Sequence, residues 1–368
     1  MYLKLYYIIN NLYCFEVGRL KKYEIVANSI SEEIRSGHYP NGTSLPTEEQ
    51  LTKEYGVSRQ TVRKALSILK ERNIIEKRQG SGSYVKILNP GANSRKVAVI
   101  ATYIDDYIFP GQLRGVEEVL SKNNYSAFLS ATKNSISSER RILEDILKNP
   151  VAGILAEGTK TALPNPNISL YKKLSEQNIP IVFFNSCYPG LTGPLYVCAD
   201  NYGGGYELAT YLLNKGHKKI ASIFKADDIQ GHQRYSGYIS AMFDNGIFIS
   251  DSMTIWYTTE TKDGIFEDSE KILSSLGGAT AVVCYNDEIA FKLIRLLTTC
   301  GKKVPEDIAV VSFDNSSLSE MSHIKITSLS YDSKNIGTIA AGKLIDIIEG
   351  KKASSETIPW KLAEKESS

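Results

Sequence analysis

Five basic residues lie within one short stretch near the amino terminus: Arg59, Arg63, Lys64, Lys70 and Arg72. Arg59 and Arg63 are four residues apart, so they share one face near the start of a predicted helix. Arginine pairs bidentately with guanine, and a helix of this size fits the major groove of DNA. A run of charge on a helix is also typical of a solvated face. The neighbouring elements decide between these interpretations.

Those neighbours predict a small helical unit followed by a hairpin. Apolar spacing predicts a helix over 23–36. A second helix begins at Thr47, where Gln50 completes a capping box. Ser58 caps the third helix, and residues 74–88 predict two strands around a glycine-containing tip. Behind its basic face the third helix carries an apolar stripe formed by Val62, Leu66 and Leu69. Together these elements favour a winged helix-turn-helix.

Charge is distributed unevenly along the 368 residues. The whole chain has a net charge of only +2, whereas residues 21–86 carry 12 Lys and Arg against 8 Glu, a net of +4. A basic amino-terminal module joined to a mildly acidic body points to a polyanionic partner for that module.

Residues 23–85 resemble the GntR-type winged helix in three motifs, LPTEEQL (45–51), YGVSRQTVRKAL (55–66) and IIEKRQGSGSYV (74–85). The resemblance implies contacts with double-stranded DNA. The residues that it implies are Glu48, Ser58, Arg59, Gln60, Thr61, Arg63, Gln79 and Gly80. Some family members have a basic residue where Glu49 stands, so the resemblance assigns no base contact to that position.

From Arg95 onward, apolar runs rich in β-formers alternate with helical stretches. The predicted strands lie within 97–102, 125–132, 151–157, 179–185, 220–225, 253–259, 281–287 and 308–314. Continuous apolar strands separated by helices are typical of parallel sheets covered on both faces. About 270 residues is long for one such unit, which predicts two lobes.

Acidic residues follow three of these strands: Glu157, Asp287 and Asp314. Ligands of open parallel sheets bind at the carboxyl ends of the strands. Carboxylates, arginine and aromatic faces together suit a polyhydroxyl ligand, since charged groups hydrogen-bond hydroxyls and rings cover C–H faces. For each acid alone a helix cap or a solvated loop is the alternative, above all for Asp314. As a group they favour binding.

Catalytic signatures are missing from the sequence. It contains no phosphate-binding G-x-x-x-x-G-K-[ST], no H-E-x-x-H and no G-x-S-x-G. Four scattered histidines and five widely spaced cysteines suggest neither a metal site nor a disulfide framework. We therefore expect no catalytic residues, no metal and no cofactor, and a reducing cytoplasmic location.

Residues 96–362 resemble the LacI-type, periplasmic-binding-protein-like sensor. The carrying motifs include ADNYGGGYELATYLLNKGHKKIASI (199–223), QRYSGY (233–238), CYNDEIA (284–290) and VPEDIAVVSFDN (304–315). The resemblance implies that Arg234 and Asp287 grip effector hydroxyls, and that Asp200 is structural.

A GntR-type helix joined to a LacI-type body is similar to the family of arabinose-responsive repressors, through YIDDYIFP (103–110), AEGTKTAL (156–163) and IFKADDIQG (223–231). That resemblance implies a sugar site, with L-arabinose as the expected effector. The site residues implied are Tyr107, Phe109, Glu157, Arg234 and Asp287. Another pentose, a nucleoside or a sugar phosphate remains as an alternative effector, and an enzyme or a passive dimerisation scaffold as an alternative body.

The predicted fold is an amino-terminal winged helix-turn-helix (α+β) plus an α/β body of two doubly wound parallel-sheet lobes. The predicted division is an extension outside the fold (1–20), a DNA-binding domain (21–88), a linker (89–95) and an effector-binding and dimerisation domain (96–368). The apolar start is too short and too interrupted to predict a membrane span or a signal peptide. We expect a homodimer on a pseudo-palindromic operator, because a two-fold dimer needs two half-sites.

Overall fold

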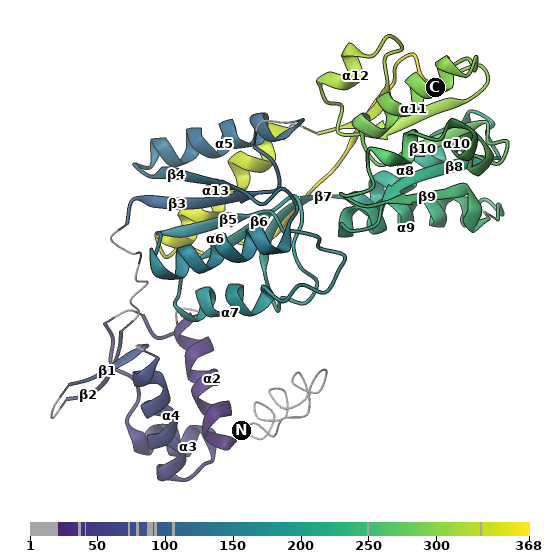
Figure 1. Ribbon diagram of the computed structural model, residues 1–368. Coiled ribbons are helices and arrows are strands. Elements are labelled where there is room, and N and C mark those ends of the chain that lie inside the picture. Colours follow the sequence, from purple (N-terminus) through teal and green to yellow (C-terminus); the bar gives the residue numbers. More distant parts are fainter. Residues whose placement is uncertain are drawn as a thin grey trace. The chain divides into compact units, whose positions relative to one another are not determined.

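The computed structural model describes residues 21–35, 38–40, 42–72, 74–78, 81–86, 91, 94–104, 107–248, 250–331 and 333–368. The predicted amino-terminal extension and most of the predicted linker lie outside these ranges. The chain divides into two compact units near residues 92 and 93 (Figure 1). Each unit has its own apolar core.

Within its described residues, the first unit contains three helices and a hairpin. Its elements are α2 (Lys22–Arg35), α3 (Glu48–Tyr55), α4 (Arg59–Glu71), β1 (Ile75–Arg78) and β2 (Gly82–Val85). The strands pair antiparallel. Thr47 and Gln50 form the predicted capping box, and Gly56 ends α3 in the left-handed conformation that glycine adopts freely. The predicted stripe is buried, and the three helices followed by a paired hairpin confirm the winged helix-turn-helix.

The second unit consists of two lobes, each built on a six-stranded sheet (Figure 1). The strands of lobe 1 are β3 (Lys96–Ala101), β4 (Ser126–Ala131), β5 (Gly153–Ala156), β6 (Ile181–Phe184), β7 (Leu195–Ala199) and β13 (Glu356–Ile358). Its helices are α5 (Phe109–Lys122), α6 (Ile136–Lys148), α7 (Ile168–Glu176) and α13 (Ser333–Ile348). The sheet is parallel throughout, in the order β13-β7-β6-β5-β3-β4. Two apolar clusters lie on opposite faces of it, one shared with α5 and α13 and the other with α6 and α7.

Lobe 2 repeats this plan. Its strands are β8 (Ile220–Lys225), β9 (Thr254–Tyr257), β10 (Ala281–Cys284), β11 (Ala309–Phe313), β12 (Thr327–Ser330) and β14 (Lys361–Ala363). Its helices are α8 (Asn201–Asn214), α9 (Ile229–Asp244), α10 (Ser269–Ser275), α11 (Asp287–Thr299) and α12 (Ser317–Met321), with single 3₁₀ turns η1 (Asp251–Met253) and η2 (Gly264–Phe266). The order is β14-β12-β11-β10-β8-β9, and only β14 runs antiparallel to its neighbour.

All eight predicted strands are present, and the two-lobed parallel fold is confirmed. Four strands escaped prediction: β7, β12, β13 and β14. The expectation that every strand is covered on both faces is wrong for the edge strand β4, where Phe128 and Leu129 are 50% and 44% exposed. The chain passes between the lobes three times, after β7, between β12 and α13, and between β13 and β14. The carboxyl ends of both sheets therefore face a common cleft.

Candidate functional site

The exposed face of α4 carries Arg59, Gln60 and Arg63, three of the residues predicted to contact DNA. Ser58 is the N-cap of α4 and accepts a hydrogen bond from the Thr61 amide at 3.2 Å. Arg59, Gln60 and Arg63 are exposed, while the opposite side of the helix is buried in the core. The helix is therefore apolar behind and cationic in front, as the sequence predicted.

Glu48, the first residue of α3, holds both arginines of α4. Its Oε2 accepts from Arg63 Nε at 2.8 Å and from Arg59 Nε at 3.2 Å. Slight burial opposes ionisation of Glu48, but the two arginines outweigh it and lower the pKa of the carboxyl. Because each arginine uses Nε here, the outer nitrogens of both guanidinium groups can pair bidentately with a base. Glu48 thus orients the two side chains.

Two hydroxyl groups of the predicted DNA-binding set bond each other. Ser58 Oγ and Thr61 Oγ1 lie 2.8 Å apart, so in the absence of DNA these hydroxyls cap the N-terminus of α4. On the hairpin, Arg78 pairs with Glu76 at 2.8 Å and lies over the ring of Tyr84. Gln79 and Gly80, predicted to touch DNA from the tip, lie outside the described residues.

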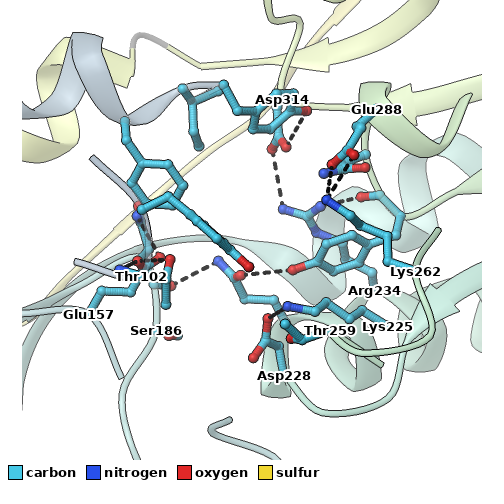
Figure 2. A pocket seen from close by; sticks show the side chains of 18 of the residues that line it. Thr102, Glu157, Ser186, Lys225, Asp228, Arg234, Thr259, Lys262, Glu288 and Asp314 are labelled. Atoms are coloured by element: carbon cyan, nitrogen blue, oxygen red, sulfur yellow. Dashed lines mark hydrogen bonds and ion pairs between the residues drawn. The ribbon is translucent and has the colours of Figure 1, made fainter. Parts of the chain in front are cut away.

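A cavity lies between the two lobes of the second unit, at the carboxyl ends of both sheets (Figure 2). Tyr107, Phe109 and Glu157 line it from lobe 1, and Arg234 lines it from lobe 2. The structure thus brings together four of the five residues predicted to bind the effector, along with Asp314.

Arg234 of α9 is buried and fixed on several sides. Its Nη2 lies 3.4 Å from Asp314 Oδ1, Nε donates to Asn201 Oδ1 at 3.0 Å, and Nη1 donates to the carbonyl of Tyr285. The guanidinium lies over the rings of Phe313, Tyr285 and Trp360 at 4.2, 4.8 and 5.5 Å. Burial alone would lower the pKa of Arg234. The charge of Asp314 and the neighbouring tyrosines outweigh burial and raise the pKa above its ordinary value, so the guanidinium stays charged. The result is a rigid cationic donor in an aromatic wall.

Tyr107 crosses the cleft from lobe 1 to lobe 2. Its hydroxyl donates to Asp314 Oδ2 at 2.8 Å and accepts from the Asp287 amide, at the start of α11, at 3.1 Å. Tyr107 has φ 63°, a strained value for a bulky side chain. Asn185 and Asp314, also on the cavity wall, have φ 60° and 93°. Such strain gathers at functional sites.

The structure does not place Asp287 on the cavity wall, and this differs from the prediction. Its carboxylate is buried under three serines. Oδ2 accepts from the Ser316 amide at 2.6 Å and from its hydroxyl at 2.9 Å, and Oδ1 accepts from the hydroxyls of Ser328, at 2.7 Å, and Ser312. These donors occupy both oxygens, so Asp287 ties α11 to β11 and β12. Asp314, at the end of β11, faces the cavity instead.

Glu157 follows β5 and is the acidic group of lobe 1. It accepts from the amide of Thr102 at 2.8 Å, from the hydroxyl of Thr102, and from Asn185 Nδ2 at 3.0 Å. Burial raises the pKa of Glu157, and these hydrogen bonds only partly offset it. Asn185 is held in turn by Gln112 at 2.8 and 2.9 Å. Lobe 1 therefore offers a fixed acceptor surrounded by polar groups.

The remaining charges on the wall occur as pairs. Lys225 Nζ lies 2.6 Å from Asp228 Oδ2, and Lys262 Nζ lies 2.8 Å from Glu288 Oε1 (Figure 2). Burial lowers the pKa of Lys225, but the neighbouring carboxylates raise it by more. Each lysine is thus neutralised by an acid next to it. The wall offers many hydrogen-bonding groups and no surplus of positive charge.

Sequence reasoning missed most of the polar wall. The residues that it did not single out for binding are Thr102, Tyr103, Asn185, Ser186, Lys225, Asp228, Gln230, Tyr257, Thr259, Lys262, Tyr285, Asn286, Glu288 and Tyr331. Strand-end position was the signal that could have found Thr102, Asn185 and Asn286, because each follows a strand closely.

In the described residues, no group of three or more His, Cys, Asp or Glu side chains is arranged to hold a metal ion. Within the same ranges, the helices are too short or too polar for any of them to cross a membrane.

Two family models match the chain. Residues 22–85 match the bacterial regulatory proteins of the gntR family, and residues 209–368 match the periplasmic binding protein-like domain. These matches agree with the two resemblances inferred from the motifs.

Among curated proteins, the arabinose metabolism transcriptional repressor of Halalkalibacterium halodurans is 36% identical over 90% of this chain and 90% of its own length. The protein of the same name from Geobacillus stearothermophilus is 34% identical over 90% of this chain and 92% of its own. Among solved structures, the transcription regulator CcpA of Lactococcus lactis superposes with a TM-score of 0.66 at 24% identity, over 74% of this chain and 98% of that one. That last likeness concerns the fold alone.

Proposed function

The chain belongs to the family of the arabinose metabolism transcriptional repressors, and from this premise we propose that it is a dimeric repressor that L-arabinose or a related sugar releases from its operator. Like these relatives, the chain is a transcriptional repressor and not an enzyme. We also propose the effector, the dimer and the roles of individual residues.

The observation that carries the sugar assignment is the cavity between the lobes. Arg234 and Asp314 form a fixed donor and acceptor side by side, and Glu157 forms a second acceptor on the opposite lobe. Tyr107 and Phe109 add aromatic surface. Paired polar groups with apolar faces between them fit a sugar ring, whose hydroxyls need partners and whose C–H faces need contact. We assign to Asp314 the hydroxyl-binding role that the sequence had suggested for Asp287.

Charge favours a neutral sugar over a sugar phosphate. The wall has four carboxylates, Glu157, Asp228, Glu288 and Asp314, and three cations, Lys225, Arg234 and Lys262. Each of the three cations has one of these carboxylates within 3.4 Å. Among the described lining residues, a phosphate group would find no free cation and would meet surplus negative charge.

On the DNA side, we propose that Arg59 and Arg63 read bases, and that Gln60, Gln79 and Gly80 add contacts along the groove. Phosphate contacts supply most of the affinity, and base contacts supply the sequence preference. Sugar binding closes the lobes and changes the dimer geometry, so the two reading helices leave register with their half-sites. The coupling is reciprocal, because DNA weakens sugar binding by the same factor as sugar weakens DNA binding.

Exposed edge strands support the dimer, and the free cysteines support a cytoplasmic location. β4 and β9 are the corresponding edge strands of the two sheets. Each exposes large apolar side chains, Phe128 and Leu129 on β4 and Trp256 on β9. Exposed apolar surface on an edge strand favours an interface. The four cysteines within the described residues are all free of disulfides, which agrees with a reducing compartment.

Isothermal titration of the purified protein tests the effector. We expect L-arabinose to bind with micromolar affinity, and D-xylose, D-ribose and D-galactose to bind more weakly. We expect D-ribose 5-phosphate to give no heat. Tight binding of the phosphate ester would contradict the charge argument. No heat from any sugar would leave the repressor family standing and remove the sugar assignment.

A further inference from the structure

Outside the cavity, the two lobes touch directly through two loops. Residues 159–162 follow β5 in lobe 1, and residues 226–228 link β8 to α9 in lobe 2. The amide of Ala162 donates to the carbonyl of Asp227 at 3.3 Å, and the amide of Ile229 donates to Thr161 Oγ1 at 3.0 Å. Backbone groups of one lobe thus have partners on the other.

Asn134 of lobe 1 contacts both loops. Its side chain is buried, with 1% exposure. Oδ1 accepts from the Lys160 amide at 2.8 Å, within its own lobe. Nδ2 reaches lobe 2, where it lies 2.6 Å from Thr259 Oγ1 and 3.4 Å from both Asp227 Oδ2 and Asp228 Oδ1. A single amide therefore joins a loop of lobe 1 to a cluster of lobe 2.

Asp227 is the centre of that cluster and is 1% exposed. Its Oδ2 accepts from the amide and hydroxyl of Thr259 at 3.0 and 2.7 Å. Lys160 Nζ approaches from lobe 1 to 3.8 Å and also pairs with Glu260 of lobe 2. A buried carboxylate is costly unless cations and donors surround it, and here one of those cations belongs to the opposite lobe.

The lobe 1 residues of this contact are held in an uncommon backbone conformation. Asn134 has φ 52° and Lys160 has φ 46°, both in the left-handed region. Thr159, next to Lys160, is fixed from behind, since its amide donates to Tyr188 Oη at 2.6 Å and its hydroxyl bonds Thr132 at 3.1 Å. Backbone strain kept in place by surrounding bonds is a mark of functional positions.

We propose that Asn134, Lys160 and Asp227 form an inter-lobe clasp, a set of positioning residues that sets how tightly the cavity binds its sugar. This inference rests on the proposed function. None of the three lines the cavity, yet they contact Thr259, Asp228 and Lys225, which do. The clasp stabilises the arrangement in which both walls are at binding distance, and it makes no contact with the sugar.

This arrangement has a quantitative consequence. If the clasp acts only on the fraction of molecules in the binding-competent arrangement, its loss divides the affinity for every sugar by the same factor. A residue that touched the sugar would instead alter the ranking among sugars. Uniform weakening therefore separates a positioning role from a contact role.

The test compares Asn134→Gly with Lys133→Gly in the full-length protein. Glycine suits the left-handed backbone at both positions, where φ is 52° and 51°. The two variants therefore differ in the side chain removed, and Lys133 is exposed. We expect Asn134→Gly to raise the Kd of every sugar that the wild type binds by about tenfold, with unchanged ratios between them. Lys133→Gly is expected to match the wild type.

Amide hydrogen exchange without sugar supplies a second measurement. The amides of Ala162 and Thr259 should exchange about tenfold faster in Asn134→Gly than in Lys133→Gly, because both donate to Asp227, which belongs to the clasp. If the wild type binds no sugar, the proposed function fails while the exchange rates still test the clasp. Unchanged exchange rates, or weakened binding of one sugar alone, would overturn the clasp proposal. Lys160→Met repeats the comparison should Asn134→Gly fail to fold.

Discussion

Arg63 Nε donates to Glu48 Oε2 at 2.8 Å, and this bond joins the first residue of α3 to the exposed face of α4. The same oxygen accepts from Arg59. An acid that faces a polyanion is unfavourable by itself, since it repels phosphate. Here it fixes two flexible arginines before DNA arrives, which lowers the entropy lost on binding. We therefore propose that Glu48 lowers general DNA affinity and raises selectivity.

Arg63→Ala removes a side chain that we propose reads a base. We expect operator affinity to fall by about 1–3 kcal/mol, with relaxed preference at one base position in each half-site. Duplexes selected by the wild type from a random library supply the operator, and fluorescence anisotropy measures the affinity. An unchanged operator titration would remove Arg63 from the reading face.

Glu48→Gln keeps the size of the side chain and removes its charge. We expect non-specific DNA affinity to rise, because a repulsive charge is lost. Specific binding gains less, because the arginines are then less well oriented. The ratio of specific to non-specific affinity should fall, and anisotropy on selected and scrambled duplexes measures it. A ratio equal to that of the wild type would show that Glu48 does not act through the arginines.

Asp314 and Asp287 should respond differently to the same change. Asp314→Asn removes the carboxylate that pairs with buried Arg234 on the cavity wall, so stability should fall, and the folded protein should bind sugar more weakly by about 1.5–3 kcal/mol. Asp287→Asn disturbs a carboxylate bound by serines, and stability should fall by about 1–3 kcal/mol while the surviving folded protein binds sugar. Calorimetry of unfolding and of binding separates the two. The reverse pattern would restore Asp287 to the ligand site.

Stability should depend on pH through Asp287. Burial raises the pKa of this carboxyl from 3.8 to about 6, even though the serines oppose the change. Between those values the folded state holds a proton that the unfolded state has lost, so stability falls as pH rises from about 4 to 6 and is level above. The full difference corresponds to about 3 kcal/mol.

Urea unfolding from pH 4 to pH 7 measures this contribution, as wild type minus Asp287→Asn. The subtraction removes the titration of groups that do not interact with Asp287, whereas the charge of Asp314 contributes to the raised pKa of Asp287. A difference that stays constant across the window would mean that the carboxyl keeps an ordinary pKa in the folded chain.

The edge strand β4 provides a test of the dimer. Phe128→Asp places a charge on apolar surface that the proposed interface would bury, and we expect the dimer dissociation constant to rise by about 100-fold or more. Sedimentation velocity measures it. Met321→Asp is the control, because Met321 is 76% exposed and lies on α12, away from both edge strands. Equal behaviour of the two variants would move the interface away from β4.

Local sequence patterns predicted the helices and strands better than they predicted the directions in which side chains point. The capping box at Thr47, the buried stripe of α4 and eight apolar strands were visible because each rests on neighbouring residues. β13 and β14 have only three residues each, and β12 is TSLS, so their state depends on strands far away in the sequence. Pattern alone does not reveal such partners.

The cavity shows the same division. Glu157, Asp287 and Asp314 follow strands in the structure as the sequence predicted. The orientation of the Asp287 side chain, however, depends on Ser312, Ser316 and Ser328, which are 25 to 41 residues away. Tertiary contacts turned that side chain inward. The contact between Asn134 and Asp227, 93 residues apart, is likewise invisible to spacing and composition.

Trp360 gives the chain an optical signal of its own. It is one of two tryptophans, it is 8% exposed, and its ring packs against Tyr331 and lies near the guanidinium of Arg234, both on the cavity wall. A ligand that shifts Arg234 changes the electric field at the indole of Trp360 and the quenching of its fluorescence. Trp256, on an edge strand, contributes a background that Trp256→Phe removes. Occupancy of the cavity could then be followed by ultraviolet emission, in real time and without an attached dye.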